Sequence, residues 1–372
     1  MKENSISKNH LQTRFHGLDI LRGIAILFVM IGHTTLLIPK PLKSWYQLIQ
    51  LDGVAFFFVL SGFLIGGILL RQMEKEPFTF KKAKDFLIRR WFRTLPNYFV
   101  VLIFLVVFSY LFDTIKYKGF DWTYFFFMQN MSQGTRGFFG ESWSLAVEEY
   151  FYLFLASVVF LLSNFFKGRL TLIFNYIIIF TILSVLGFRI YLFYNAELFV
   201  KDIPFFTFCR FDSIMVGVLG AWLFVSRPKM NLSWAWISLI LGVGVLILLK
   251  LTAFLSDYLA IVYFPLFRSL SVLMMFPLLL IWQNKGTLVE RFLVFTGKIS
   301  YSLYLINLCV VMYIVIEFVI NKTWEKTNFE TDIWYWLIPV YWIVSYLLAT
   351  ILYYTIEIPF LKLRDKMIPN EG

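Results

Sequence analysis

Two residues in the first apolar stretch of the chain could do chemistry inside a membrane. Arg22 and His33 lie in the mostly apolar run 18–38, eleven positions apart. A helix turns about 100° per residue, so eleven residues return to nearly the same face about 16 Å further along the axis. One helix would therefore carry a cation at one depth and an imidazole at another. Ionisable groups are costly in hydrocarbon, and they usually mark a functional interior.

His33 is the candidate general base because it alone of the three histidines lies in a predicted span. The other two, His10 and His16, belong to the polar N-terminal segment. A histidine beside a carboxylate can accept a proton while the carboxylate holds the ring in one tautomer. Either Glu148 or Asp52 could supply that carboxylate, and the sequence leaves both open.

The composition indicates a helical membrane protein. The chain is 59% hydrophobic and 20% aromatic, with 15% charged residues, whereas soluble domains are about 25% charged. Apolar runs of about 18–25 residues predict membrane-spanning helices. We expect ten of them, near 17–38, 50–71, 95–113, 144–165, 170–192, 205–225, 232–250, 258–282, 299–320 and 333–360. The predicted fold class is therefore all-α and polytopic, with a tail at 1–16, a transmembrane domain at 17–360 and a basic tail at 361–372.

The distribution of charge predicts that both termini are cytoplasmic. On this arrangement, 21 Lys and Arg residues lie on the side of the termini and nine on the other side. Short loops on the cytoplasmic side carry such an excess. The bias accounts for most of the net charge of +11 without a nucleic-acid partner. It predicts a multi-pass protein of the cell (inner) membrane, in contact with lipid.

Cys209 and Cys309 show no zinc spacing, and no metal is expected.

This topology sorts the buried polar residues into two layers. The inner layer holds Arg22, Arg89, Arg90 and Arg93. The outer layer holds His33, Asp52, Glu148, Arg210 and Asp212. Clustered arginines bind phosphates bidentately, so an extended phosphorylated molecule could be anchored in the inner layer with its reactive end at His33. Coenzyme A thioesters have this form.

Structural roles could also explain these residues. The arginines of 89–93 could be ordinary positive-inside residues, and Arg22 could extend to the membrane surface. His33 could be a structural hydrogen-bonding residue, and Glu148 could face water at the interface.

Several segments, taken in order, resemble the membrane acyltransferase-3 family, which O-acylates sugars and polysaccharides. They are GLDILRGIAILFVMIGH (17–33), LDGVAFFFVLSGFLIGGILLR (51–71), FLIRRWFRTLPNYF (86–99), ESWSLAVEEYFYL (141–153), CRFDSIMVGVLGAWL (209–223) and GKISYSLYLINL (297–308). The closing Glu357-x-Pro359 with its basic tail also fits. The resemblance implies about ten helices, an acyl-CoA donor and an external or periplasmic acceptor.

The resemblance also implies roles for individual residues. It maps the family's arginine–histidine pair onto Arg22 and His33 and its characteristic acid onto Glu148. Asn307 stands where many members carry a histidine, so His33 must serve alone as base. Some members carry a C-terminal hydrolase-like domain. Because this chain ends at Gly372, it is expected to be of the stand-alone type.

We therefore expect an integral membrane O-acyltransferase. It would move an acyl group, expected to be acetyl, from cytoplasmic acyl-CoA to a hydroxyl of a cell-surface or periplasmic carbohydrate. The expected catalytic residues are His33, Glu148 and Asp52, and the expected donor-binding residues are Arg22, Arg89, Arg90 and Arg93. Direct attack by the acceptor and a transient acyl-His33 both remain open, with Asn307 or Tyr304 as candidate oxyanion donors.

A proton-coupled membrane transporter is the competing class, because buried charge and a titrating histidine are also transporter features. Against it, the sequence shows no internal repeat and no pair of Gly- or Pro-broken helices. A third class is a flippase-like subunit acting on lipid-linked sugars, which would bind polyprenyl lipid and cleave no thioester.

Overall fold

The computed structural model describes residues 15–75, 78–112, 119–131, 137–165, 170–196, 199–225, 231–317 and 334–368. Within these ranges the chain is helical and has no β-strand. Nine of the described helices are long and apolar enough to cross a membrane, and one bent pair brings the number to ten. The prediction of an all-α protein with about ten spans is therefore confirmed.

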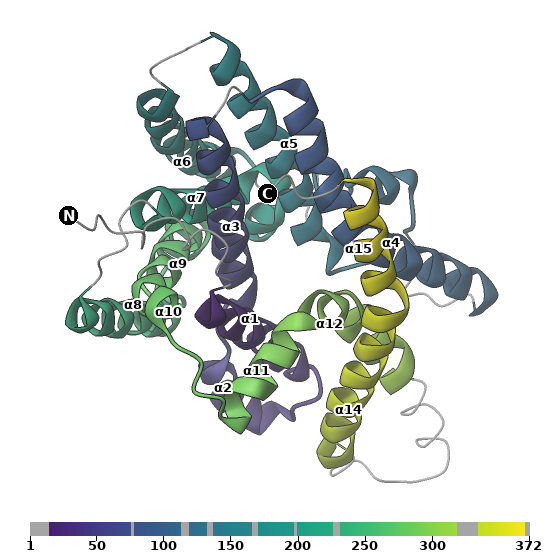
Figure 1. The fold of residues 1–372 in the computed structure, drawn as a ribbon. Coiled ribbons are helices and arrows are strands. Elements are labelled where there is room, and N and C mark those ends of the chain that lie inside the picture. Colours follow the sequence, from purple (N-terminus) through teal and green to yellow (C-terminus); the bar gives the residue numbers. More distant parts are fainter. Residues whose placement is uncertain are drawn as a thin grey trace, which may run out of the picture.

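The elements follow one another in a bundle with few extended connections (Figure 1). Those of the first half are α1 (His16–Thr34), α2 (Lys40–Ile49), α3 (Gly53–Lys75), α4 (Phe80–Phe112), η2 (Trp122–Phe126), α5 (Ser142–Phe165) and α6 (Leu170–Asn195). Next come η3 (Val200–Phe205), η4 (Thr207–Arg210), α7 (Phe211–Val225), α8 (Leu232–Thr252), η5 (Leu259–Tyr263), α9 (Phe264–Leu273) and α10 (Phe276–Ile281). The last are α11 (Leu288–Lys298), α12 (Ser300–Ile306), η6 (Asn307–Ile316), α14 (Trp334–Leu352), η7 (Tyr353–Glu357) and α15 (Ile358–Met367).

The helices α1, α3 and α7 form the interior of the bundle. Their spans are 61–72% buried, whereas those of α6 and α8 are 22% buried and present apolar side chains outward. Backbone contact joins α3 to α7, because a Cβ atom on Gly62 would lie 1.8 Å from the carbonyl oxygen of Ile214. Small residues permit such close approach between membrane helices. The backbones of these interior helices are thus in close contact, which defines the relative positions of the residues they carry.

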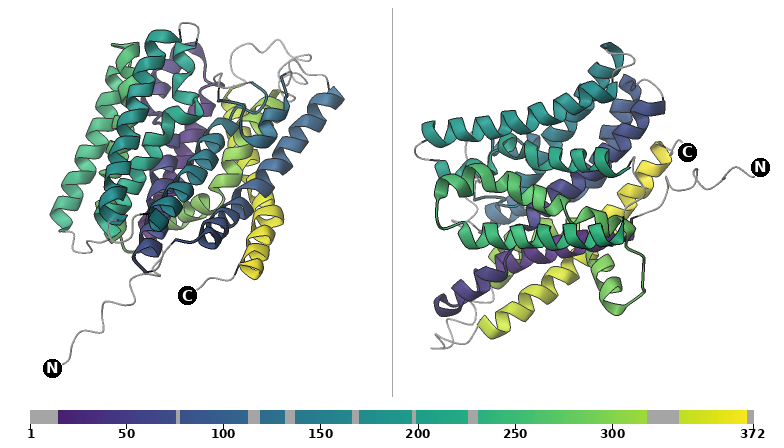
Figure 2. Two further views of the ribbon diagram at one scale, coloured as in Figure 1. Left: turned by 90° about the horizontal axis from the view of Figure 1, so that it is seen from above. Right: turned by 90° about the vertical axis from the view of Figure 1, so that its left-hand side faces the viewer.

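The third spanning helix begins much earlier than the sequence predicts. The expected span was 95–113, but α4 runs unbroken for 33 residues from Phe80 to Phe112, with Pro96 inside it. The basic residues of its first half lower the mean hydropathy and hide the helix from a search for apolar runs. The last helical element also continues to Met367 rather than ending at 360. It lies beside the first half of α4 (Figure 2).

The ninth expected span, 299–320, forms the second arm of a bent pair of helices, and its residues 318–320 lie outside the described part of the chain. Between α11 and α12 the chain bends by 60°, and α12 passes directly into η6, which has π-helical hydrogen bonding. A Cβ atom on Gly297 would lie 2.5 Å from the carbonyl oxygen of Asp19, so the close approach of α1 to the bend requires glycine. Segments of π-helix occur frequently at functional sites, and Asn307 is the first residue of this one.

The carboxylate of Glu141 holds the start of η6 in place. It accepts hydrogen bonds from the backbone N–H of Leu308 at 3.0 Å and from that of Cys309 at 2.7 Å. It also accepts one from the Cys309 thiol at 2.6 Å. Both Glu141 and Cys309 are buried. This carboxylate therefore satisfies donors at the junction of α12 and η6, where the helical pattern changes.

Candidate active site

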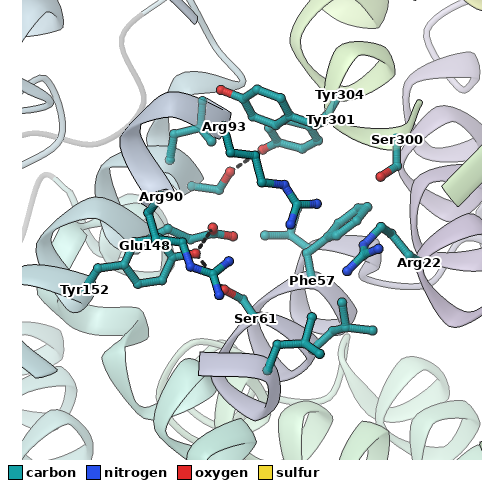
Figure 3. Close-up of a pocket in the computed structure, with 15 residues that line it drawn as sticks. Arg22, Phe57, Ser61, Arg90, Arg93, Glu148, Tyr152, Ser300, Tyr301 and Tyr304 are labelled. Atoms are coloured by element: carbon teal, nitrogen blue, oxygen red, sulfur yellow. Dashed lines mark hydrogen bonds between the residues drawn. The ribbon is translucent and has the colours of Figure 1, made fainter. Parts of the chain in front are cut away.

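A cavity of about 100 Å³ lies among the helices of the bundle, and we call it the central cavity. Its polar and charged lining comes from α1, α3, α4, α5 and α12, in the residues Arg22, Ser61, Arg90, Arg93, Ser144, Glu148, Tyr152, Ser300, Tyr301 and Tyr304. The three guanidinium groups extend into it from different sides (Figure 3). Such a cluster of arginines in a buried cavity is suited to hold an anion.

Glu148 is the member of the Glu148–Glu149 pair that faces the central cavity. The Tyr152 hydroxyl donates to Glu148 Oε2 at 2.5 Å and lies 2.6 Å from Ser61 Oγ. Because the single Tyr152 proton goes to Glu148, Ser61 donates to Tyr152. Glu149 instead faces α4, where it accepts hydrogen bonds from Trp91 and Thr94.

The position of Glu148 differs from the predicted outer layer. It shares its cavity with Arg22, Arg90 and Arg93, and no described hydrogen bond joins it to His33. It lies six residues into α5, which is about 9 Å along the helix axis. That depth is enough to bring Glu148 level with the arginines.

A second cavity, the basic cavity, adjoins the first and has a volume of about 670 Å³. Its charged lining residues are Lys81, Lys82, Asp85, Arg89, Arg90, Arg93 and Arg364. Arg90 and Arg93 line both cavities, whereas Arg89 lines only the basic one and donates to the carbonyl oxygen of Ile368 at 2.7 Å. The structure thus brings the four predicted arginines to one end of the bundle, with two of them at the junction of the cavities.

His33 lines a third cavity, the histidine cavity, with a volume of about 500 Å³. Its polar lining residues are His33, Gln50, Asp52, Arg210, Lys250 and Arg268. Val54 lines both this cavity and the central one. The three cavities therefore follow one another through the bundle, with the arginines at one end and the imidazole at the other.

Asn307 is the hydrogen-bond partner of the His33 ring. Its Oδ1 lies against His33 Nδ1 and also accepts from the Tyr341 hydroxyl at 3.1 Å. Its amide nitrogen donates to the carbonyl oxygens of Leu303 and Tyr304 at 2.8 and 2.9 Å. Carbonyl oxygens can only accept, so this network fixes which side of the amide faces the histidine.

The Asn307 contact defines the tautomer of His33. Because Asn307 Oδ1 accepts, Nδ1 of His33 must carry the proton, which leaves the lone pair of Nε2 free. Among the residues that the structure describes, none makes a hydrogen bond to this Nε2. His33 is therefore prepared to accept a proton from a molecule in its cavity.

Asp52 interacts with arginines rather than with His33. Its Oδ2 lies 3.5 Å from Arg210 and 3.6 Å from Arg268, and its Oδ1 accepts from the Ala55 N–H at 3.1 Å, at the start of α3. Burial opposes ionisation of this carboxyl, but the two arginines and the Ala55 hydrogen bond outweigh it and hold the pKa of Asp52 below its usual value. Asp52 is therefore an ionised member of the histidine cavity.

Three other expected residues have structural partners. Asp212 forms a fully buried ion pair with Arg189 at 2.6 Å. Asn307 uses its amide nitrogen on two backbone carbonyls and is fully buried, so it is not available as an oxyanion donor. The Tyr304 hydroxyl donates to the carbonyl oxygen of Glu141 and lies 2.6 Å from Ser144 Oγ.

Sequence reasoning missed three residues of the histidine site. Arg268 is the only charged residue in the apolar run 258–282, and a lone cation at membrane depth was a usable signal. Lys250 is the last residue of the run 232–250, where a lysine is typical of an ordinary helix end. Nothing in the sequence around Tyr341 distinguishes it from the many other aromatic residues of the predicted spans.

Within the described part of the chain, no group of His, Cys, Asp and Glu is arranged to hold a metal ion.

The fold and the cavities together define a multi-pass helical membrane protein with an arginine-lined interior and a histidine whose Nδ1 is bound by Asn307. The family model described as "Acyltransferase domain" matches residues 15–361. The chain therefore belongs to this acyltransferase family, as the resemblance of its motifs predicted. That membership favours an enzyme over a transporter.

Curated relatives agree with the family. A protein of Staphylococcus aureus (strain COL) named "Putative O-acetyltransferase" is 28% identical over 80% of this chain and 51% of its own length. The "Peptidoglycan O-acetyltransferase OatA" of Listeria monocytogenes is 33% identical over 37% of this chain and 22% of its own length. This chain spans about half the length of the first of these relatives. No solved structure matches the chain.

Proposed function

We propose that this protein is a membrane O-acyltransferase that moves an acetyl group from acetyl-CoA to a hydroxyl of a carbohydrate on the other side of the membrane. The acyltransferase family and the O-acetyltransferase relatives support the reaction class. The name of the Listeria relative supports a cell-wall carbohydrate as acceptor. The observation that carries the proposal is the succession of cavities from the arginines to His33.

The basic cavity is suited to the phosphates of the donor. It has six cationic lining residues and one acidic residue, Asp85. By the positive-inside rule its end of the bundle faces the cytoplasm, where acyl-CoA is available. Arg90 and Arg93 stand where the basic cavity meets the central one, so the pantetheine arm would continue past them toward Val54.

The acceptor would enter the histidine cavity from the opposite side. His33 Nε2 removes the proton from the acceptor hydroxyl as its oxygen attacks the thioester carbonyl carbon. The carbon–sulfur bond then breaks, and the coenzyme A thiolate takes up the proton from His33. In the alternative sequence, Nε2 attacks the thioester carbonyl carbon first, and the carbon–sulfur bond breaks to release the coenzyme A thiolate. The acceptor hydroxyl then attacks the carbonyl carbon of the acyl-imidazole, the carbon–nitrogen bond breaks to restore Nε2, and the hydroxyl proton goes to the thiolate. Either sequence requires the tautomer that Asn307 favours.

The test is the variant His33→Ala in cells that depend on this gene for surface acylation. Mass spectrometry of surface glycans should show the acetyl mass increment with the wild-type protein and lose it with the variant. Immunoblotting of the membrane fraction would establish that both proteins accumulate equally. Retained acetylation with His33→Ala would remove the imidazole from the reaction.

A further inference from the structure

The histidine cavity carries more positive than negative charge. The side chains of Arg210, Lys250 and Arg268 line it, and among the described residues of its lining Asp52 is the only carboxylate. The neighbouring Arg189–Asp212 pair is closed and contributes no excess charge. Lys250 and Arg268 are half-buried and Arg210 is buried. Because cations removed from water are stabilised by a paired anion, this excess of positive charge favours a ligand of opposite charge.

Asp52 leaves most of the arginine donors unused. Both guanidinium groups approach the same oxygen, Oδ2, at 3.5 and 3.6 Å. A tight charge-assisted pair has a distance of about 2.7–2.9 Å and often uses two parallel hydrogen bonds. The Arg189–Asp212 pair, at 2.6 Å, is of that tight kind. The two arginines of the histidine cavity can therefore bind a second anion without giving up Asp52.

Arg210 is held in place by aromatic rings rather than by hydrogen bonds alone. It is 3% exposed, and its Cζ lies 5.3 Å from the ring centre of Phe58 and 5.9 Å from that of Trp143. Its Nε has no hydrogen-bond partner in the described structure. A buried cation is costly unless it is paired, and Arg210 lines the same cavity as His33.

We propose that the histidine cavity selects an acceptor with a negatively charged group, a carboxylate or a phosphate, close to the hydroxyl that is acylated. Arg210 and Arg268 bind the anion beside Asp52, and Lys250 binds it from the end of α8. The anion then holds the neighbouring hydroxyl at His33 Nε2. This inference rests on the proposed acyl transfer and adds to it the chemical class of the acceptor.

Binding to the purified full chain in nanodiscs of neutral lipid tests the anion site without any turnover. The probes are a galacturonic acid trimer, a glycerol phosphate trimer and an uncharged galactose trimer. At least one charged probe should bind at least tenfold more tightly than the uncharged one, and added salt should weaken only charged binding. The tighter of the two charged probes identifies the anion as carboxylate or phosphate. Equal binding of all three probes would overturn the proposal.

Three variants test whether the named cations are responsible. Lys250→Gln and Arg268→Gln should each weaken binding of the charged probe about tenfold, because each removes a charge-assisted contact. Arg268→Lys keeps the charge and should stay within about threefold of wild type. Lys201→Gln, an exposed lysine of η3 that does not line the cavity, is the matched control and should bind normally. Unchanged binding in both Gln variants of the cavity would contradict the proposal.

Acyl transfer from acetyl-CoA to the same probes separates this inference from the proposed function. Selective binding of a charged probe with no acetylation of any probe would overturn acyl transfer and leave the anion site. Acetylation of the uncharged probe at the same kcat/KM as the charged ones would overturn anion selection and leave acyl transfer.

Discussion

At the scale of single residues, the His33–Asn307 contact has the most direct consequence for chemistry. The Oδ1 atom of the asparagine supplies a hydrogen-bond acceptor to the His33 ring. Its own orientation is set by the backbone of α12 and by Tyr341. One neutral side chain therefore orients the imidazole without placing a charge beside it.

The variant Asn307→Ala tests this positioning role. Without the acceptor, His33 can adopt either tautomer and can rotate, so we expect kcat to fall by roughly 100-fold or more. Affinity for acetyl-CoA should be unchanged, because the arginines lie in other cavities. Tyr341→Phe is the control, since it removes one hydroxyl from the same oxygen and should reduce kcat only a few-fold. Parallel losses of kcat and donor affinity in Asn307→Ala would indicate a general loss of structure instead.

The arginines and Glu148 of the central cavity give a second residue-scale prediction. Arg90→Gln should weaken acetyl-CoA binding about tenfold, because one charge-assisted contact to a phosphate is lost. Glu148→Gln should have the opposite effect on the affinity for acetyl-CoA. It should strengthen donor binding, because it removes a negative charge beside three arginines. Calorimetric titration of the purified variants measures both. If Glu148→Gln weakens donor binding instead, the carboxylate does not face the donor anion.

At the scale of elements, the junction of α12 and η6 determines where Asn307 lies. The carboxylate of Glu141 binds two backbone N–H groups at the start of η6, one residue or two beyond Asn307. A loop residue that precedes α5 thus holds a distant helix in a π-helical form. Similarly, the continuity of α4 carries Arg90 and Arg93 from the basic cavity to the central one.

The variants Glu141→Ala and Glu141→Gln test the junction. Alanine leaves two buried N–H groups without a partner, at about 1–3 kcal/mol each, so the apparent Tm in detergent and the kcat should both fall. Glutamine keeps one oxygen acceptor and should retain most of the stability. Differential scanning fluorimetry and the acyl-transfer assay provide the two readouts. An unchanged Tm for Glu141→Ala would show that the junction forms without this carboxylate.

At the scale of the whole molecule, the orientation of the helix bundle in the membrane determines which cavity opens to the cytoplasm and which to the outside. The basic cavity lies at the start of α4, and the histidine cavity lies at the start of α3 and the end of α8. The excess of Lys and Arg at the first of these ends predicts that it is cytoplasmic. Donor and acceptor would then arrive from opposite sides and meet inside the protein.

Reporter fusions test this direction. A fusion after residue 80, at the start of α4, should report a cytoplasmic position, and a fusion near residue 125, in η2, should report an external one. Alkaline phosphatase is active outside and green fluorescent protein fluoresces inside, so the two reporters should give opposite patterns. The inverse pattern would place the basic cavity away from cytoplasmic acyl-CoA and would contradict the proposed donor route.

The class of the protein and the segments that carry its ionisable residues could be predicted from the amino-acid sequence. Long apolar runs can satisfy their backbone in a membrane only as helices, so the all-α fold with about ten spans followed from local pattern. The unusual cost of charge in such runs singled out Arg22, His33 and the arginines of α4. These properties belong to single segments, and each can be recognised without knowing its neighbours.

Only the tertiary structure decided which of these residues act together. His33 and Asn307 are 274 positions apart, and their contact depends on the bend after α11 and on the π-helical start of η6. The rotation of α5 about its axis turned Glu148 toward the arginines and Glu149 toward α4. Helix rotation and bending arise from packing between segments, and neither hydropathy nor spacing within one segment reports them. The assembly of Asp52, Arg210, Lys250 and Arg268 around one cavity has the same origin, because four different elements of the chain meet there.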